Sequence, residues 1–311
     1  MLRCFVTSLL ILMLSSTLLA EATSQPAVPR VFRETIELQL GLANAGFSPG
    51  MIDGRPGAKT TYATQQFQEA NGIDVTGKAD DATMAALQMP GEGPFTTYEI
   101  TQEDQAQVTG VLTGWNERAA AKFLGYESLE DLVAEKFHTS RRCLSELNPG
   151  VDLDHIAVGD TLTVPDVGAT PKSYPHAASI EVNLEQKTIR LFDADNKVMA
   201  LFFCSIAKNK EKRPSGNATV ITIAINPDYT FDPALWTDVH DVTHKLTIPP
   251  GPRNPVGLAW VGLSLPGYGM HGTPHPEQIG KTGSHGCFRL TNWDAVRLAN
   301  MVSVGTVVTF K

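Results

Sequence analysis

Cationic side chains, cysteine and long apolar runs are all scarce in this chain of 311 residues. Lysine and arginine number 25 against 33 acidic residues, and the formal net charge is −8. The cationic residues form no cluster of the kind that follows a phosphate backbone, so we expect no nucleic acid partner. After residue 22 no stretch is long and apolar enough to span a membrane. The length predicts two or three domains.

The chain has only four cysteines, which limits both disulfides and metal sites. Removal of an N-terminal export signal would leave Cys143, Cys204 and Cys287, and an odd number in an exported chain indicates a free thiol. Cys143 and Cys204 could form a disulfide in an oxidising compartment, but nothing in the sequence brings them together. Cys287 has no second cysteine at metal-ligand spacing, so we expect no zinc, no other metal and no cofactor.

Residues 1–22 have the pattern of an export signal. Arg3 supplies a positive start, Phe5–Ala20 is dominated by apolar residues, and Ala20-Glu21-Ala22 fits the small-x-small cleavage rule. We expect cleavage after Ala22 or Ala20 and an exported protein in the periplasm or cell wall. Retention of the segment as an uncleaved anchor is the alternative.

The stretch Met270–Arg289 carries the clearest chemistry, and it reads MHGTPHPEQIGKTGSHGCFR. It contains His271, His285 and Cys287 among several glycines. A thiol becomes a nucleophile when it loses its proton, and a nearby imidazole can accept that proton. Glycines let backbone N–H groups turn toward a developing oxyanion. The alternative reading is an ordinary buried cysteine, which behaves as a small apolar residue.

The succession HGT, IG and SHGCFR resembles the signature of the L,D-transpeptidase catalytic domain, the YkuD family. This resemblance implies a mainly β, sandwich-like fold with a shallow groove over residues 177–311. It also implies that Cys287 is the nucleophile and His271 the general base, with the Gly272 carbonyl fixing the tautomer of the imidazole. His285 is closer in sequence to the cysteine and is the alternative base; otherwise it shapes the site.

Other groups in the same stretch have expected roles. The backbone N–H groups of Gly286 and Cys287 are candidate oxyanion donors. Arg289 either holds a substrate carboxylate or ties the loop down. Ser284 supports the loop beside the substrate by hydrogen bonding. Three aromatic side chains either stack on a peptide stem or sugar or simply cover the core: Trp236, Tyr229 and Trp260.

The C-terminal part alternates apolar and polar residues, which predicts β-strands with short turns. The expected strands begin near Ile180 and include Thr188–Phe192, Val198–Ile206, Ala218–Ile225 and Gly305–Lys311. A helix should follow Thr291, since threonine can cap a helix and Asp294 suits its first turn.

Residues 30–89 predict a small helical domain with turns at its Pro, Gly and Asn residues. Within it, IDGRPGAKTTYATQQFQEANGIDVTGKADDATMAAL resembles the peptidoglycan-binding type 1 domain. That resemblance implies a three-helix module that holds an enzyme on the cell wall. An ordinary helical domain is the alternative.

The middle region, residues 98–167, has helical spacing in Ala119–Phe137, on both sides of Gly125. Its second half, FHTSRRCLSELNPGVDLDHIAVGDTLTVP, resembles the end of a LysM domain. The resemblance implies an α/β module that binds glycan chains. The first half is longer than such a module needs, so a spacer that packs on the catalytic domain is the alternative.

These expectations combine into a multidomain α+β protein whose partner is peptidoglycan, both stem peptides and glycan strands. The resemblance implies a cysteine-dependent L,D-transpeptidase that releases the terminal D-alanine, carries the stem as a thioester and forms 3→3 cross-links. If water takes the acyl group, the enzyme is an L,D-carboxypeptidase. A non-catalytic wall-binding protein is the third hypothesis, and the intact set of thiol and imidazoles argues against it.

Overall fold

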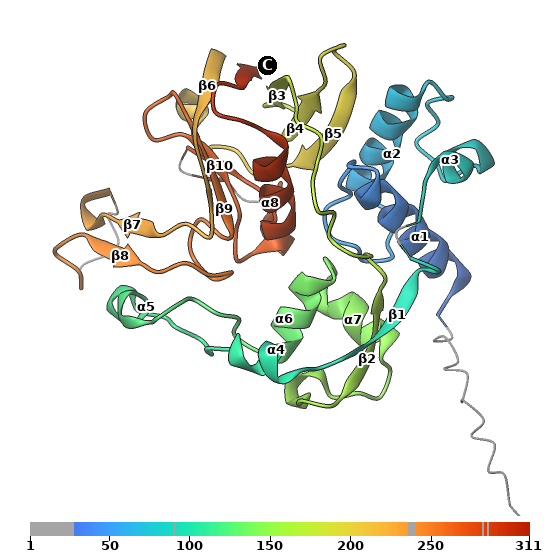
Figure 1. Cartoon of the computed structure of the whole chain (residues 1–311), viewed down its shortest axis with the longest axis horizontal. Coiled ribbons are helices and arrows are strands. Elements are labelled where there is room, and N and C mark those ends of the chain that lie inside the picture. The colour runs from blue at the N-terminus through green and yellow to red at the C-terminus, as the bar shows by residue number, and fades with distance from the viewer. Residues whose placement is uncertain (1–27, 90, 236–240, 282, 285) are drawn as a thin grey trace, which may run out of the picture.

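The computed structural model describes residues 28–89, 91–235, 241–281, 283–284 and 286–311. The expected signal at residues 1–22 therefore lies outside the described residues. Three parts follow one another along the chain: a helical N-terminal part, a middle part, and a C-terminal part built around a large sheet (Figure 1). Within the described ranges, no helix combines the length and apolar character needed to cross a lipid bilayer.

The N-terminal part consists of α1 (Arg30–Asn44), α2 (Ala58–Asn71) and α3 (Asp81–Ala86). Asp80 begins α3 by accepting a hydrogen bond from the backbone N–H of Thr83 at 2.9 Å, which satisfies a donor left free at the helix start. Leu38 and Leu42 of α1 pack against Phe67 of α2 in a buried cluster. The helical N-terminal domain predicted from the sequence is confirmed.

The middle part contains β1 (Phe95–Glu99), α4 (Gln102–Ala106), α5 (Trp115–Ala120), α6 (Leu129–Lys136), α7 (Arg141–Leu147), the 3-10 helix η1 (Leu153–His155) and β2 (Thr161–Pro165). β1 and β2 pair antiparallel, with Phe95 opposite Pro165. Leu132 and Leu144 from the two longer helices share a buried cluster with Leu162 of β2. Along the chain, α4 and α5 lie between β1 and α6.

The prediction of a helix around Phe123 and Leu124 is wrong. α5 ends at residue 120 and α6 begins at residue 129. Between them the backbone N–H of Tyr126 donates to the carbonyl of Gln107 at 2.9 Å. A Cβ at Gly125 would lie 2.2 Å from the same carbonyl oxygen. Two backbones approach closely here, and this pairing replaces the helical hydrogen bonds.

The C-terminal part contains β3 (Ser179–Asn183), β4 (Thr188–Phe192), β5 (Val198–Phe203), η2 (Lys210–Lys212), β6 (Gly216–Ile225), β7 (Tyr229–Phe231), η3 (Pro233–Leu235), β8 (Leu246–Ile248), β9 (Ala259–Leu263), β10 (Gly269–His271), η4 (Pro276–Gln278), β11 (Phe288–Arg289), α8 (Asn292–Met301) and β12 (Val307–Phe310). Eight of these strands form one sheet in the order β11-β10-β9-β6-β12-β3-β4-β5, and β7 pairs with β8 as a separate hairpin. The mainly β fold is confirmed, but the strands form one continuous mixed sheet in place of the two layers of a sandwich.

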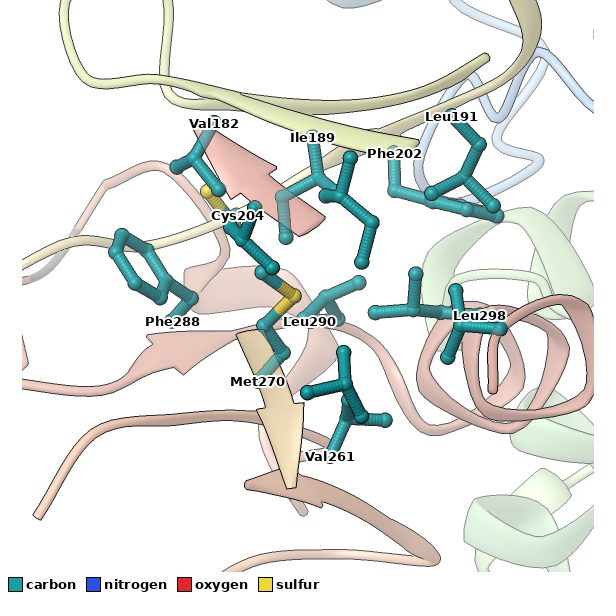
Figure 2. Packing of buried hydrophobic residues seen from close by; sticks show 14 of the residues in the cluster. Val182, Ile189, Leu191, Phe202, Cys204, Val261, Met270, Phe288, Leu290 and Leu298 are labelled. Carbon is teal, nitrogen blue, oxygen red and sulfur yellow. The ribbon is translucent and has the colours of Figure 1, made fainter. Parts of the chain in front are cut away.

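One apolar core joins the two ends of this sheet. Ile189 and Phe202 from one end share a buried cluster with Met270 and Phe288 from the other, and Leu298 of α8 packs among them (Figure 2). Complete burial of a large apolar side chain contributes roughly 1.5–3 kcal/mol. The sheet curls around this shared core, and the core holds the short strands β10 and β11 in place.

The N-terminal helices pack directly on the C-terminal part. Leu201 and Phe203 of β5 belong to the same buried cluster as the apolar residues of α1 and α2. Ser48 donates a hydrogen bond to the Asp294 carboxylate of α8 at 2.8 Å. Lys59 of α2 donates to the carbonyl of Ile279 at 2.7 Å. Ile279 lies in the loop between HGT and SHGC, so the N-terminal part supports the loop that carries the candidate site.

Candidate active site

Strand register brings the two halves of the HGT…SHGC stretch together. β10 and β11 pair parallel, with Met270 opposite Phe288 and His271 opposite Arg289. Met270 and Phe288 are buried in the core, so His271 and Arg289 face the other side of the sheet. Cys287 precedes β11 by one residue and falls on the face of Arg289. Neighbouring strands lie about 4.8 Å apart, and two residues along a strand span about 6.6 Å. These two perpendicular distances together put the Cα atoms of His271 and Cys287 roughly 8 Å apart.

The His271 imidazole is buried and held in one tautomer. Its Nδ1 lies 2.7 Å from the carbonyl oxygen of Gly272. A carbonyl oxygen can only accept, so Nδ1 carries the proton and Nε2 has a free lone pair. The ring stacks on Trp260 of β9, with centroids 5.6 Å apart. Burial lowers the pKa of His271 to about 4, although the hydrogen bond to the Gly272 carbonyl raises it.

Cys287 is the one partly accessible thiol among the described cysteines. Its Sγ donates to the carbonyl of Gly267 at 3.4 Å, and burial raises the pKa of this thiol. Cys143 and Cys204 are free and fully buried, and burial raises the pKa of each to about 12. The disulfide that they could have formed is absent, and nothing in the sequence indicated that the two cysteines meet. At neutral pH the Cys287 thiol and the His271 imidazole are therefore both neutral.

Hydrogen bonds shape the loop before Cys287. The Ser284 hydroxyl donates to the Cys287 carbonyl at 2.5 Å and accepts from the Gly286 N–H at 3.3 Å. The backbone N–H of Ser284 donates to the Ile206 carbonyl at 2.8 Å. Arg289 donates to the Gly283 carbonyl at 2.9 Å, a contact that fits one of the two roles considered for this arginine, that of tying the loop down. These contacts fix the backbone on either side of the sulfur.

A buried polar network behind the histidine was not predicted. Asn292, the first residue of α8, donates to the Glu135 carboxylate of α6 at 3.0 Å and accepts from the Leu258 N–H at 3.1 Å. A Cβ at Gly272 would lie 2.2 Å from the Asn292 Oδ1 atom. The backbone that holds the His271 tautomer therefore rests against Asn292. A sequence signal exists only for Asn292, which directly follows the predicted helix cap.

Arg253 makes a second link from α6 to the same loop. Its guanidinium pairs with the Asp131 carboxylate of α6 and donates to the Pro274 carbonyl. Asp131 and Glu135 are four residues apart, so they lie on one face of α6. That helix is therefore linked to the backbone after His271 through two side chains, Asn292 and Arg253.

A cavity of about 200 Å³ lies between the middle and C-terminal parts, beside this loop. The C-terminal part contributes Arg253, His275 and Arg289 to its lining, and the middle part contributes Trp115, Arg118 and Glu127. Nothing in the sequence places residues 109–127 at the site, because the contact joins segments far apart in the chain.

The aromatic residues considered for substrate contact lie in different parts of the structure. Tyr229 of β7 packs near Trp115 of α5, with ring centroids 6.4 Å apart, and Trp260 stacks on the histidine. Trp236 and His285 lie outside the described residues. Within the described part of the chain, no group of three or more His, Cys, Asp or Glu side chains could hold a metal ion.

Comparison with known proteins gives the family of two parts. Residues 177–309 match the model described as "L,D-transpeptidase catalytic domain" (YkuD), and residues 33–87 match "Putative peptidoglycan binding domain". Both matched ranges leave out residues 98–167, so the LysM resemblance stays a prediction.

Individual relatives carry the same family name. The chain is 29% identical over 183 residues to "Putative L,D-transpeptidase YkuD" of Bacillus licheniformis, covering 59% of this chain and 93% of that protein. It is 34% identical over 120 residues to "Putative L,D-transpeptidase YqjB" of Bacillus subtilis, covering 37% of this chain and 60% of that protein.

Among solved structures, an L,D-transpeptidase from Xylanimonas cellulosilytica is 17% identical, with a TM-score of 0.36 over 92% of this chain and 100% of that chain. On the two sequence matches, residues 177–309 belong to the YkuD family of L,D-transpeptidase catalytic domains and residues 33–87 to the peptidoglycan-binding domain family.

Proposed function

We propose that the chain is a cysteine-dependent L,D-transpeptidase that forms 3→3 cross-links between peptidoglycan stem peptides. The observation that supports this proposal is the parallel register of β10 and β11, in which the tautomer-locked His271 lies opposite Arg289, two residues after Cys287. The match to the catalytic domain family supplies the reaction class.

The first half-reaction forms a thioester. His271 Nε2 takes the thiol proton of Cys287 as the sulfur attacks the carbonyl carbon of the third stem residue. The carbonyl oxygen becomes an oxyanion near the backbone N–H groups of Gly286 and Cys287. The bond to the terminal D-alanine then breaks, and the imidazolium returns the proton to the leaving amine.

In the second half-reaction the side-chain amine of another stem attacks the thioester. The imidazole accepts a proton from that amine, the carbon–sulfur bond breaks, and the thiol leaves with the proton. Water in place of the amine would give L,D-carboxypeptidase activity. Burial keeps the imidazole unprotonated when the substrate arrives, which a general base requires.

His285 is the alternative base, and a comparison of single variants separates the two. His271→Ala should slow thioester formation more than His285→Ala; the reverse ranking would exchange their roles.

Outside the catalytic domain, we propose that residues 30–89 hold the enzyme on glycan strands of the exported wall and that residues 98–167 add a LysM-like glycan contact.

Mass analysis of muropeptides tests the proposal as a whole. The full chain lacking residues 1–22 is incubated with tetrapeptide-bearing muropeptides. We expect cross-linked dimers and free D-alanine. Tripeptide monomers without dimers would indicate the carboxypeptidase, and unchanged muropeptides that nevertheless sediment with sacculi would indicate a binding protein.

A further inference from the structure

The cavity between the middle and C-terminal parts lies within reach of a peptide bound at Cys287. Arg289 belongs to its lining and stands two residues after the nucleophile on the same face of the sheet. The two residues from Cys287 to Arg289 span about 6.6 Å along the strand, and two residues of an extended stem peptide cover the same distance. A stem peptide whose scissile carbonyl meets the sulfur can therefore place a neighbouring group in the cavity.

Cationic groups dominate this cavity, although the chain as a whole has a net charge of −8. Arg118, Arg253 and Arg289 line it, and Glu127 is the acidic residue among the lining groups. Arg253 is already paired with Asp131. Arg118 donates through Nε to the Leu112 carbonyl at 2.9 Å, and none of the ion pairs found in the described ranges includes it. Its remaining N–H groups can serve a ligand.

The middle segment is firmly seated where it forms this cavity. Trp115 of α5 stacks on Phe231 of the β7–β8 hairpin, with centroids 3.8 Å apart and an interplanar angle of 14°. The backbone N–H of Leu124 donates to the Pro250 carbonyl at 2.8 Å, and the N–H of Arg253 donates to the Leu124 carbonyl at 3.1 Å. The Arg118 guanidinium lies 5.4 Å from the Trp115 ring centroid, which limits its movement. The cation is therefore positioned before a ligand arrives.

We propose that this cavity binds a carboxylate of the donor stem peptide and that Arg118, from outside the catalytic domain, is the residue that selects for it. The proposal rests on the transpeptidase function above and assigns donor recognition to residues 109–127. Guanidinium groups suit carboxylates because their donors form a planar fork. The chain would then discriminate among stems by a segment inserted in its middle part.

The test compares stem peptides in the full chain without residues 1–22. The donors are a tetrapeptide stem with all carboxylates free and a series in which each carboxylate is amidated in turn. The values of kcat and KM are measured from release of the terminal residue, as D-alanine or, where its own carboxylate is amidated, as D-alaninamide. Arg118→Ala should lower kcat/KM for the free stem about ten- to a hundredfold, mainly through KM. Amidating the recognised carboxylate should produce the same loss in the wild type and remove the effect of the substitution.

Two further variants control for folding and charge. Arg118→Lys keeps the charge without the fork and should give an intermediate loss. Arg142→Ala removes an exposed cation of α7 that is paired with Glu146 and lies outside the cavity lining, and it should leave kcat/KM unchanged. Equal losses for free and amidated stems, or no loss with either Arg118 variant, would overturn the proposal.

A neutral acyl donor separates this inference from the proposed function. Acylation of Cys287 by p-nitrophenyl acetate needs the thiol but no carboxylate site, so Arg118→Ala should leave its rate unchanged. If neither this ester nor any stem acylates Cys287, the proposed function fails. If the ester and the stems both acylate Cys287, but the Arg118 substitutions change kcat/KM by the same factor for free and amidated stems, only the proposal of a carboxylate site fails.

Discussion

The Glu135 carboxylate accepts a hydrogen bond from the side chain of Asn292 at 3.0 Å, although one residue belongs to the middle part and the other begins α8. Asn292 in turn contacts the backbone at Gly272, whose carbonyl holds the His271 tautomer. A residue of the middle part is therefore hydrogen-bonded to the side chain that contacts the backbone holding His271, the candidate base. Changes in α6 should reach the chemistry through this contact.

Ionisation of Glu135 should make the fold less stable as pH rises. Burial raises the pKa of this carboxyl to about 7 from its ordinary 4.5. Between these values the unfolded chain has lost the proton and the folded chain has kept it, so the free energy of unfolding falls with pH. The shift corresponds to about 3 kcal/mol. Glu135→Gln keeps an oxygen for Asn292 and cannot ionise.

Denaturant unfolding of the wild type and Glu135→Gln from pH 4.5 to 8 measures this effect. The stability of the wild type relative to the variant should fall across the range by up to about 3 kcal/mol. Glu103→Gln removes an exposed carboxylate of α4 and controls for the loss of charge alone. Parallel curves for the wild type and Glu135→Gln would contradict the prediction.

A methyl group at Gly272 should disturb both stability and catalysis. Gly272→Ala would place a Cβ 2.2 Å from the Asn292 Oδ1 atom, so the backbone or α8 must move. Overpacking of this kind costs about 1–3 kcal/mol of stability. The Gly272 carbonyl should shift with it and lower kcat for thioester formation.

Gly57→Ala is the matched control, because nothing lies within 4 Å of a Cβ there. Thermal unfolding and single-turnover acylation of both variants check the prediction. An unchanged acylation rate in a folded Gly272→Ala protein would show that the carbonyl position does not matter.

The acid limb of acylation should lie well below the ordinary histidine pKa. Burial lowers the pKa of His271 to about 4, so the imidazole stays unprotonated down to that pH. Single-turnover acylation by a carbapenem, followed by absorbance from pH 3.5 to 8, should reach half its maximum nearer pH 4 than pH 6.5. A half-maximum at pH 6.5 would point to an exposed histidine as the base.

Local features of this fold are readable in the sequence. Threonine before Asn-Trp-Asp predicts the start of α8, and Thr291 accepts from the Asp294 N–H at 3.2 Å as expected. Alternating apolar residues predict β4 at its observed bounds, Thr188–Phe192. These signals depend on neighbours along the chain, which is why they can be read without a structure.

Long-range contacts could not be predicted in the same way. The curled single sheet depends on Phe202 and Phe288 meeting in one core, and alternation along a strand does not say which sheet partner follows. Nothing near Arg118 or Glu135 in sequence indicates that they approach the site. Their positions depend on how the middle part packs, so the candidate site is larger than its motif.

The most direct measurement is mass analysis of the protein after incubation with a carbapenem, followed by digestion to locate the adduct. We expect one adduct on the Cys287 peptide, none on the peptides of the buried Cys143 and Cys204, and no adduct in Cys287→Ala. An adduct on another residue, or one that survives Cys287→Ala, would contradict it.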